Sequence, residues 1–113
     1  MVINKQNAKK YSWGNNCESF ELLNTEGLSV KQETMPPGSK EKKHFHNEAK
    51  QLFYVLKGEA TFYIGDETIK LKQNESVFIE AKQKHLVENS TSETIEFLVI
   101  SQPSTNEDRV DAE

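Results

Sequence analysis

The stretch that decides the fold runs Gly38-Ser-Lys-Glu-Lys-Lys-His44-Phe-His46-Asn-Glu-Ala-Lys-Gln51-Leu-Phe-Tyr-Val-Leu-Lys-Gly58. It holds two of the chain's three histidines, and the third is His85. Residues two apart on an extended strand point to the same side, so His44 and His46 are expected to project together. Imidazole is the commonest metal ligand in proteins. The sequence therefore predicts a metal site made by His44, His46 and His85.

Outside this stretch, short apolar runs recur with turn residues between them, and helical periodicity is hard to find. This spacing predicts an all-β sandwich or barrel in a single domain. We expect strands at Phe20–Asn24, Leu28–Met35, Lys43–His46, Gln51–Lys57, Ala60–Gly65, Thr68–Lys72, Ser76–Ile79, His85–Asn89 and Thr94–Gln102.

The quoted stretch resembles the first motif of the cupins: a glycine, five residues, His-x-His, a few residues, a glutamate, six residues and a glycine. The stretch Asn74–Asn89 resembles the second motif. Cupins are small antiparallel jelly-roll β-barrels that commonly hold a metal inside. The resemblance therefore implies a jelly-roll barrel. It also implies one divalent transition metal ion, bound by His44, His46, Gln51 and His85.

The chain departs from the family pattern at four positions. Gln51 stands where cupins usually have glutamate, Asn74 and Lys82 replace glycines, and Glu80 replaces a proline. A glutamine offers only a neutral carbonyl oxygen, so three imidazoles and one amide leave the full charge on the ion and favour anionic guests. Alternatively, Gln51 only hydrogen-bonds a neighbour and water takes its place on the metal. This ligand set suits Fe, Mn, Ni, Cu, Co or Zn and does not choose among them.

The composition restricts the class of protein. The 113 residues are enough for one core, and a net charge of −4 gives no reason to expect nucleic acid. The single cysteine, Cys17, excludes an internal disulfide. The N-terminus lacks the apolar core of a signal peptide, and no apolar run approaches the roughly 20 residues that span a membrane. We expect a cytoplasmic protein.

Two segments lie outside the barrel pattern. Residues 1–19 form an arm, whose Trp13 is expected to pack against the barrel (residues 20–102) or a second subunit rather than touch substrate. The polar tail, residues 103–113, is expected to be mobile, although it could instead fold over a pocket and place Arg109 against an anion. Arg109 is the only arginine, which weighs against a nucleotide-sugar substrate. We expect the charged run at residues 40–43 to be a solvated loop.

Phe53 and Val55 share parity with Gln51 on the expected strand, so the metal is expected in a small, largely apolar pocket for a compact organic molecule.

Three functions fit these features. The first function is a metal-dependent, oxygenase-like enzyme. The second is a metal-dependent isomerase or lyase, and the third is a non-catalytic ligand-binding protein. Tyr54, Tyr63 and Glu80 lack the spacing of a general acid–base pair, so we assign no catalytic residue beyond the metal ligands. The cupin resemblance also implies a homodimer formed through the β-sheets.

Overall fold

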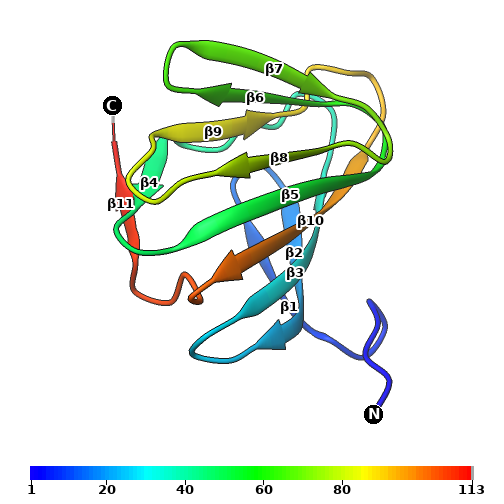
Figure 1. The fold of residues 1–113 in the computed structure, drawn as a ribbon. Helices are drawn as coiled ribbons and strands as arrows, with labels where there is room; N and C mark the ends of the chain where they lie inside the picture. The colour runs from blue at the N-terminus through cyan, green and yellow to red at the C-terminus, as the bar shows by residue number, and fades with distance from the viewer. Residues whose placement is uncertain (113) are drawn as a thin grey trace.

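A computed structural model describes residues 1–112 and shows two antiparallel β-sheets packed face to face (Figure 1). One sheet has the order β1-β2-β3-β10-β5-β8 and the other has the order β11-β4-β9-β6-β7. The strands are β1 (Lys9–Trp13), β2 (Cys17–Asn24), β3 (Ser29–Met35), β4 (His44–His46), β5 (Lys50–Lys57), β6 (Ala60–Ile64), β7 (Glu67–Leu71), β8 (Ser76–Ile79), β9 (His85–Glu88), β10 (Ile95–Gln102) and β11 (Arg109–Asp111). The predicted all-β jelly-roll architecture is confirmed.

The core forms because the long strands alternate buried and partly exposed residues. In β5 and β10 every second side chain is buried, including Phe53, Val55 and Phe97. The ring of Phe62 from the opposite sheet packs edge-on against Phe53, with centroids 5.0 Å apart. Burying one such side chain stabilises the fold by about 1.5–3 kcal/mol. The period of two in the sequence therefore becomes one shared core between the sheets.

All nine strands expected from the sequence are present, and two further strands occur near the chain ends. Strand β1 lies in the N-terminal arm and pairs with β2. Strand β11 lies in the C-terminal segment and pairs with β4 instead of leaving the barrel. The last residue of the expected tail, Glu113, falls outside the described residues. Nothing in residues 1–112 forms a helix with the length and apolar character needed to cross a membrane.

The turns beside the second motif keep a backbone that usually requires glycine. Asn74 (φ 69°) and Lys82 (φ 67°) stand where glycines are usual, and both adopt the left-handed conformation. Asparagine tolerates this region, whereas for lysine it costs roughly 1–2 kcal/mol. The Lys82 amide also donates to the carbonyl of His46 at 2.6 Å. The replacements therefore leave the turns in the conformation that supports the histidine strand.

We predict that Gly58→Ala destabilises the protein by about 1–3 kcal/mol. Gly58 has a φ of 82°, and a Cβ there would lie 2.7 Å from Cγ2 of the buried Ile95. Gly27→Ala is the matched control, because nothing lies within 4 Å of its Cβ position. Urea unfolding of both variants checks the prediction. Equal midpoints for the two would contradict it.

Candidate metal centre

The three histidines converge from two neighbouring strands of the five-stranded sheet. His44 and His46 lie on β4, and His85 begins β9, directly opposite His44 in register. All three side chains are buried, and one potential ligand nitrogen from each lies within 4.8 Å of the others. The alternation of β4 turns Phe45 away and brings both of its histidines to the barrel interior. The convergence predicted from the sequence is therefore present.

Two of the imidazoles are oriented by backbone carbonyls. Nδ1 of His44 lies 2.9 Å from the carbonyl oxygen of Lys42, and Nδ1 of His85 lies 2.8 Å from that of Gln83. A carbonyl oxygen only accepts, so each Nδ1 carries the proton and each Nε2 of the neutral ring keeps its lone pair. Nε2 of His85 is buried and has no hydrogen-bond partner among residues 1–112. A metal ion would satisfy it, so the residues present fit the ion that the fold implies.

Gln51 approaches from the opposite sheet, on β5, and lines the same cavity as His44 and His46. Its Nε2 donates to Oγ of Ser101 at 3.1 Å. Its Oε1 is buried and has no partner. The hydrogen bond to Ser101 therefore fixes the amide through its nitrogen. The oxygen stays unpaired, and it is the atom that would bind a metal ion. The alternative stated from the sequence was that Gln51 only hydrogen-bonds a neighbour while water binds the metal; the neighbour is Ser101, and because it binds the nitrogen, the oxygen is left for an ion.

Burial keeps the histidines uncharged. Loss of hydration lowers the pKa of His44 to about 3 and the pKa of His46 to about 4, and it also lowers the pKa of His85. A neutral imidazole is the form that binds metal, so the site is ready to accept an ion at neutral pH without losing protons first. The same burial means that protons compete with a metal only at distinctly acidic pH, below the pH 6.5 at which an exposed histidine titrates.

A cavity of about 250 Å³ opens beside the histidines. Its wall combines side chains of the barrel with side chains of both terminal segments. The lining residues are Tyr11, Trp13, Lys31, Glu33, Glu41, His44, His46, Gln51, Phe53, Val99, Ser101, Thr105, Asn106 and Arg109. Phe53 lines this wall, as expected, while Val55, at the same parity on β5, fills the core instead. The pocket is small, as predicted, and more polar than expected.

Two carboxyl groups in the wall were not predicted. Burial, followed by repulsion from Glu33, raises the pKa of Glu41 to about 8, and burial also raises the pKa of Glu33. Oε1 of Glu41 lies 3.8 Å from Nδ1 of His44, and its Oε2 lies 3.5 Å from Arg109. The expectation that residues 40–43 form only a solvated loop is therefore wrong for Glu41, whose side chain is 13% exposed.

One of these acids left a signal in the sequence and the other did not. Glu33 and Lys31 share parity with the buried Met35 on β3, so charged residues occupy inward positions of a strand. Such a pattern indicates a pocket rather than core. Glu41 lies in a loop, where no periodicity says which way it points. Trp13 packs against the core, as expected, but it also lines the cavity, and its buried indole Nε1 has no partner.

Comparisons with known proteins agree with this geometry. The family model described as Cupin domain matches residues 31–101. An oxalate-binding protein of Thermotoga maritima is 26% identical over 82 residues, covering 73% of this chain and 68% of that protein. An uncharacterised protein of Methanocaldococcus jannaschii is 31% identical over 84 residues, covering 74% of this chain and 72% of that protein. The crystal structure of a predicted oxalate decarboxylase from Thermotoga maritima superposes with a TM-score of 0.83 at 22% identity, covering 92% and 100% of the two chains, and so shares the fold.

We predict that the stability of the metal-free protein has a maximum near pH 6.5. Below this pH, the unfolded chain binds more protons than the folded one at His44, His46 and His85, so acid favours unfolding. Above it, the folded protein still holds the Glu41 proton up to about pH 8, whereas the unfolded chain has released it, so alkali favours unfolding. Each group contributes at most about 1.4 kcal/mol per pH unit.

Urea unfolding in the presence of a chelator, between pH 4.5 and 8.5, measures this profile. Glu41→Gln should flatten the limb above pH 6.5 and keep the acid limb, because it removes only the carboxyl. A profile of the Glu41→Gln variant that still falls as steeply above pH 6.5 would show that another group is responsible.

Proposed function

Because the chain belongs to the cupin family, we propose that it is a metal-dependent enzyme acting on a small organic molecule in the cavity beside the three histidines. His44, His46, His85 and Gln51 hold one divalent transition metal ion in this proposal. The proposal rests on two buried atoms that have no hydrogen-bond partner within residues 1–112, Nε2 of His85 and Oε1 of Gln51. Unpaired buried polar atoms are costly, and a metal ion would satisfy both.

The donor set favours an open, reactive site over a structural one. It holds no thiolate, whereas structural zinc sites are usually rich in cysteine, and Cys17 is absent from the cavity wall. Four neutral ligands leave room for substrate on a five- or six-coordinate ion. The ion would supply Lewis acidity and, if redox-active, dioxygen chemistry of the oxygenase kind. Phe53 and Val99 exclude water from one side of the cavity, while Ser101 holds Gln51 in place.

Two other functions have support of their own. Glu41 is a carboxyl that keeps its proton near neutral pH beside the histidines, which favours proton transfer in an isomerase or lyase. The Thermotoga maritima relative is named an oxalate-binding protein, which favours non-catalytic binding of a small organic acid. All three functions place a small, oxygen-rich molecule at the same metal. They differ in whether the molecule is oxidised, rearranged or only bound.

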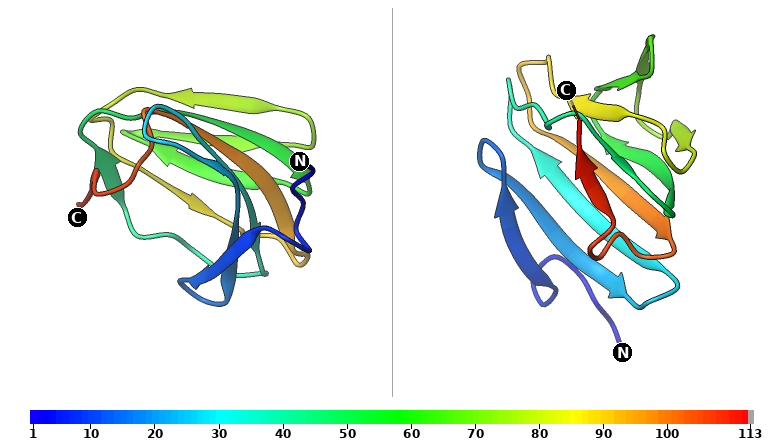
Figure 2. Two further views of the ribbon diagram at one scale, coloured as in Figure 1. Left: turned by 90° about the horizontal axis from the view of Figure 1, so that it is seen from below. Right: turned by 90° about the vertical axis from the view of Figure 1, so that its left-hand side faces the viewer.

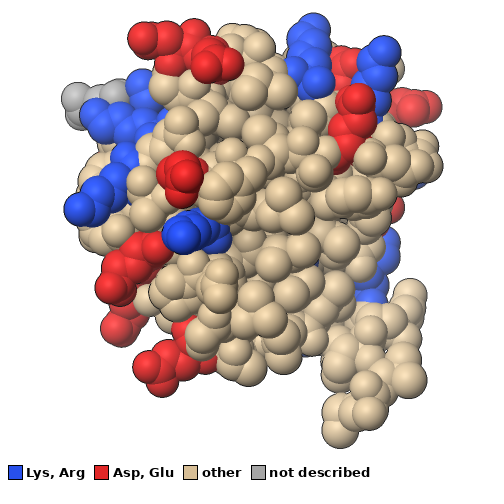
Figure 3. All heavy atoms as spheres, in the orientation of Figure 1, with Lys and Arg blue, Asp and Glu red and all other residues tan. Residues whose placement is uncertain are grey.

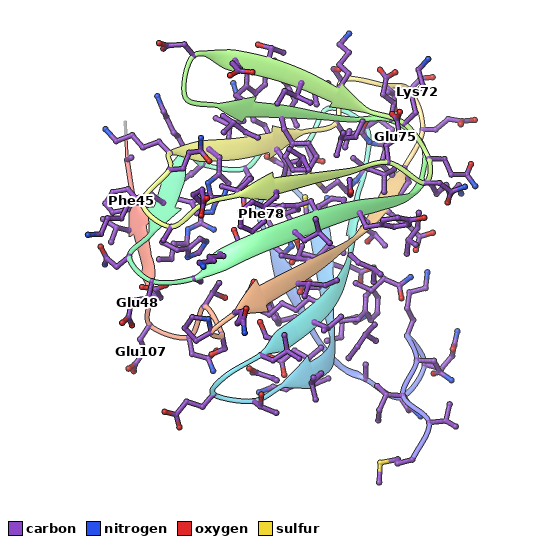
Figure 4. All side chains as sticks on the ribbon, viewed as in Figure 1. Phe45, Glu48, Lys72, Glu75, Phe78 and Glu107 are labelled. Carbon is purple, nitrogen blue, oxygen red and sulfur yellow. The ribbon has the colours of Figure 1, made fainter. Side chains whose placement is uncertain are left out.

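We predict that protein purified without an affinity tag or added metal carries about one metal ion per chain, measured by elemental mass spectrometry. His44→Ala combined with His85→Ala should abolish the metal and lower the thermal midpoint, because an ion bound only by the folded state stabilises it. Lys72→Ala is the control, since Lys72 lies at the opposite end of the barrel (Figure 4). Equal metal content in the double variant and the wild type would refute the site.

The identity of the metal directs the next assay. Iron, manganese, copper or nickel leads to oxygen-uptake measurements with small organic acids and enolisable compounds. Zinc shifts the test to isomerisation and bond cleavage without oxygen. Saturable binding of an organic acid to the metal-loaded protein, with no turnover in either assay, would favour the binding protein over both enzymes.

We also propose that two copies of the chain dimerise through the outer face of the six-stranded sheet. An apolar row crosses four of its strands in register, formed by Val30, Ile100, Leu52 and Phe78. Phe78, on the edge strand β8, is 51% exposed and lies near the centre of the view in Figure 4. Figure 3 shows that charged side chains lie mostly at the edges of the same view. A broad uncharged face of this kind is typical of a protein interface.

Light scattering should therefore give a mass of about twice 13.0 kDa for the wild type. Phe78→Lys should give a monomer, because the interface cannot bury an unpaired charge without a large loss of affinity. Val110→Lys, at an apolar side chain of 37% exposure on the other sheet, is the control and should remain a dimer. A dimeric Phe78→Lys variant would place the interface elsewhere.

A further inference from the structure

The strand that carries two of the histidines depends on the C-terminal end of the chain. Strand β4 is three residues long, and it pairs with β9 at one position only, His44 with His85. On its other side it pairs with β11 along its whole length, with His46 opposite Arg109 and His44 opposite Asp111. In the right-hand view of Figure 2, β11 is the red strand facing the viewer. Most of the backbone pairing of the histidine strand therefore comes from β11.

The residue just before β11 holds the loop between His46 and Gln51. The Asp108 carboxylate accepts hydrogen bonds from the amides of three consecutive loop residues. Its Oδ1 lies 3.0 Å from the amide nitrogen of Asn47, its Oδ1 and Oδ2 each lie 3.2 Å from that of Glu48, and its Oδ2 lies 2.9 Å from that of Ala49. The carbonyl of Asp108 accepts from Asn47 as well, at 3.3 Å. This arrangement fixes the path of the chain from one proposed ligand to the next.

The segment also holds the other flank of β4. Nη2 of Arg109 donates to the carbonyl of Lys42 at 3.4 Å, the same carbonyl that orients the His44 ring. The amide of Ala112 donates to the carbonyl of Lys43 at 2.8 Å. The C-terminal segment therefore forms hydrogen bonds with the chain both before His44 and after His46. Figure 4 shows Glu48, in the middle of the clamped loop, and Glu107, the residue before Asp108, at one corner of the barrel.

We propose that Asp108 is a positioning residue for the metal centre: by clamping the amides of residues 47–49, it sets the spacing between His46 and Gln51. This inference rests on the proposed function, since it concerns the same four ligands. The Asp108 side chain does not line the cavity, and its carboxylate hydrogen-bonds to backbone amides of the loop rather than to a ligand ring, so it acts through the backbone. Three amide donors on one carboxylate are stronger than three on a neutral acceptor, which explains an acid at this position.

The alternative is that Asp108 only adds a negative charge near the site. Asp111 provides the matched control, because it is also an acid of the C-terminal segment and lies opposite His44 in register. Its carboxylate accepts from Nε of Arg109 at 3.0 Å and has no hydrogen bond to the loop. Asp108→Asn removes a charge and the clamp's second carboxylate oxygen, whereas Asp111→Asn removes a charge alone. Comparing the two separates position from charge.

The test is titration of the metal-free, full-length protein with Co²⁺ against a competing chelator, followed by the visible absorption of bound Co²⁺. We expect Asp108→Asn to bind Co²⁺ about 10- to 100-fold more weakly, the usual loss for groups that orient metal ligands. Its absorption bands should also shift, because the Gln51 oxygen no longer sits at its place. Asp111→Asn should stay within about threefold of the wild type with an unchanged spectrum. A purely structural role would lower the thermal midpoint without altering the spectrum.

The outcomes are distinguishable. A wild type that does not bind Co²⁺ overturns the metal site and the role of Asp108 with it. A wild type that binds, together with an Asp108→Asn variant of equal affinity and spectrum, overturns the clamp alone. If Asp108→Asn fails to fold, amide hydrogen exchange of the wild type decides. The amides of Asn47, Glu48 and Ala49 should be protected, and exchange as fast as in an open loop would refute the clamp.

Discussion

The candidate site depends on burying three imidazoles together without charging them. Each loses its water on entering the barrel, and a proton on any one would repel protons on the others. The fold meets this constraint with backbone carbonyls that hold Nδ1–H of His44 and of His85, leaving Nε2 of both rings free of protons. The lowered pKa values of all three histidines follow from the same burial. Without an ion, the site is a set of unused acceptors, and that is why its chemistry points to a metal.

The acidic half of the cavity is a second consequence of the same burial. Glu33 and Glu41 lie where hydration is poor, which raises the pKa of both carboxyl groups, and repulsion from Glu33 raises the pKa of Glu41 further. Arg109 partly offsets this cost for Glu41, but it is shared with Asp111 and the Lys42 carbonyl. The cavity therefore pairs neutral imidazoles with the carboxyl of Glu41, whose pKa of about 8 keeps it protonated near neutral pH. Such a pocket would offer hydrogen-bond donors to the uncharged oxygens of a ligand, and an ion held by the imidazoles would bind an anionic group.

Much of the fold and the site could be predicted from the sequence because both follow short-range rules. The period of two located nine strands, the spacing from Gly38 to Gly58 pointed to His44, His46 and Gln51, and the second motif pointed to His85. Strand β1 escaped notice because its residues are mostly exposed and show no alternation. Strand β11 is three exposed residues long and has no pattern of its own. Glu41 escaped because the direction of a loop residue depends on contacts that only the fold creates, here with Arg109, 68 residues later.

Because β4 pairs mainly with β11, the positions of the histidines on β4 depend on the C-terminal segment being in place. A three-residue strand with one pairing position on β9 gains little from that partner alone, so β4 is not expected to be ordered before the end of the chain docks. The amides of residues 47–49 likewise find their acceptor only in Asp108, about sixty residues later. The polar C-terminal segment buries little surface by itself, so it is mainly the hydrogen bonds to the loop and to β4 that hold it against the barrel. Metal affinity should then report on the last step of folding, because the ligands reach their final spacing only once that segment is in place.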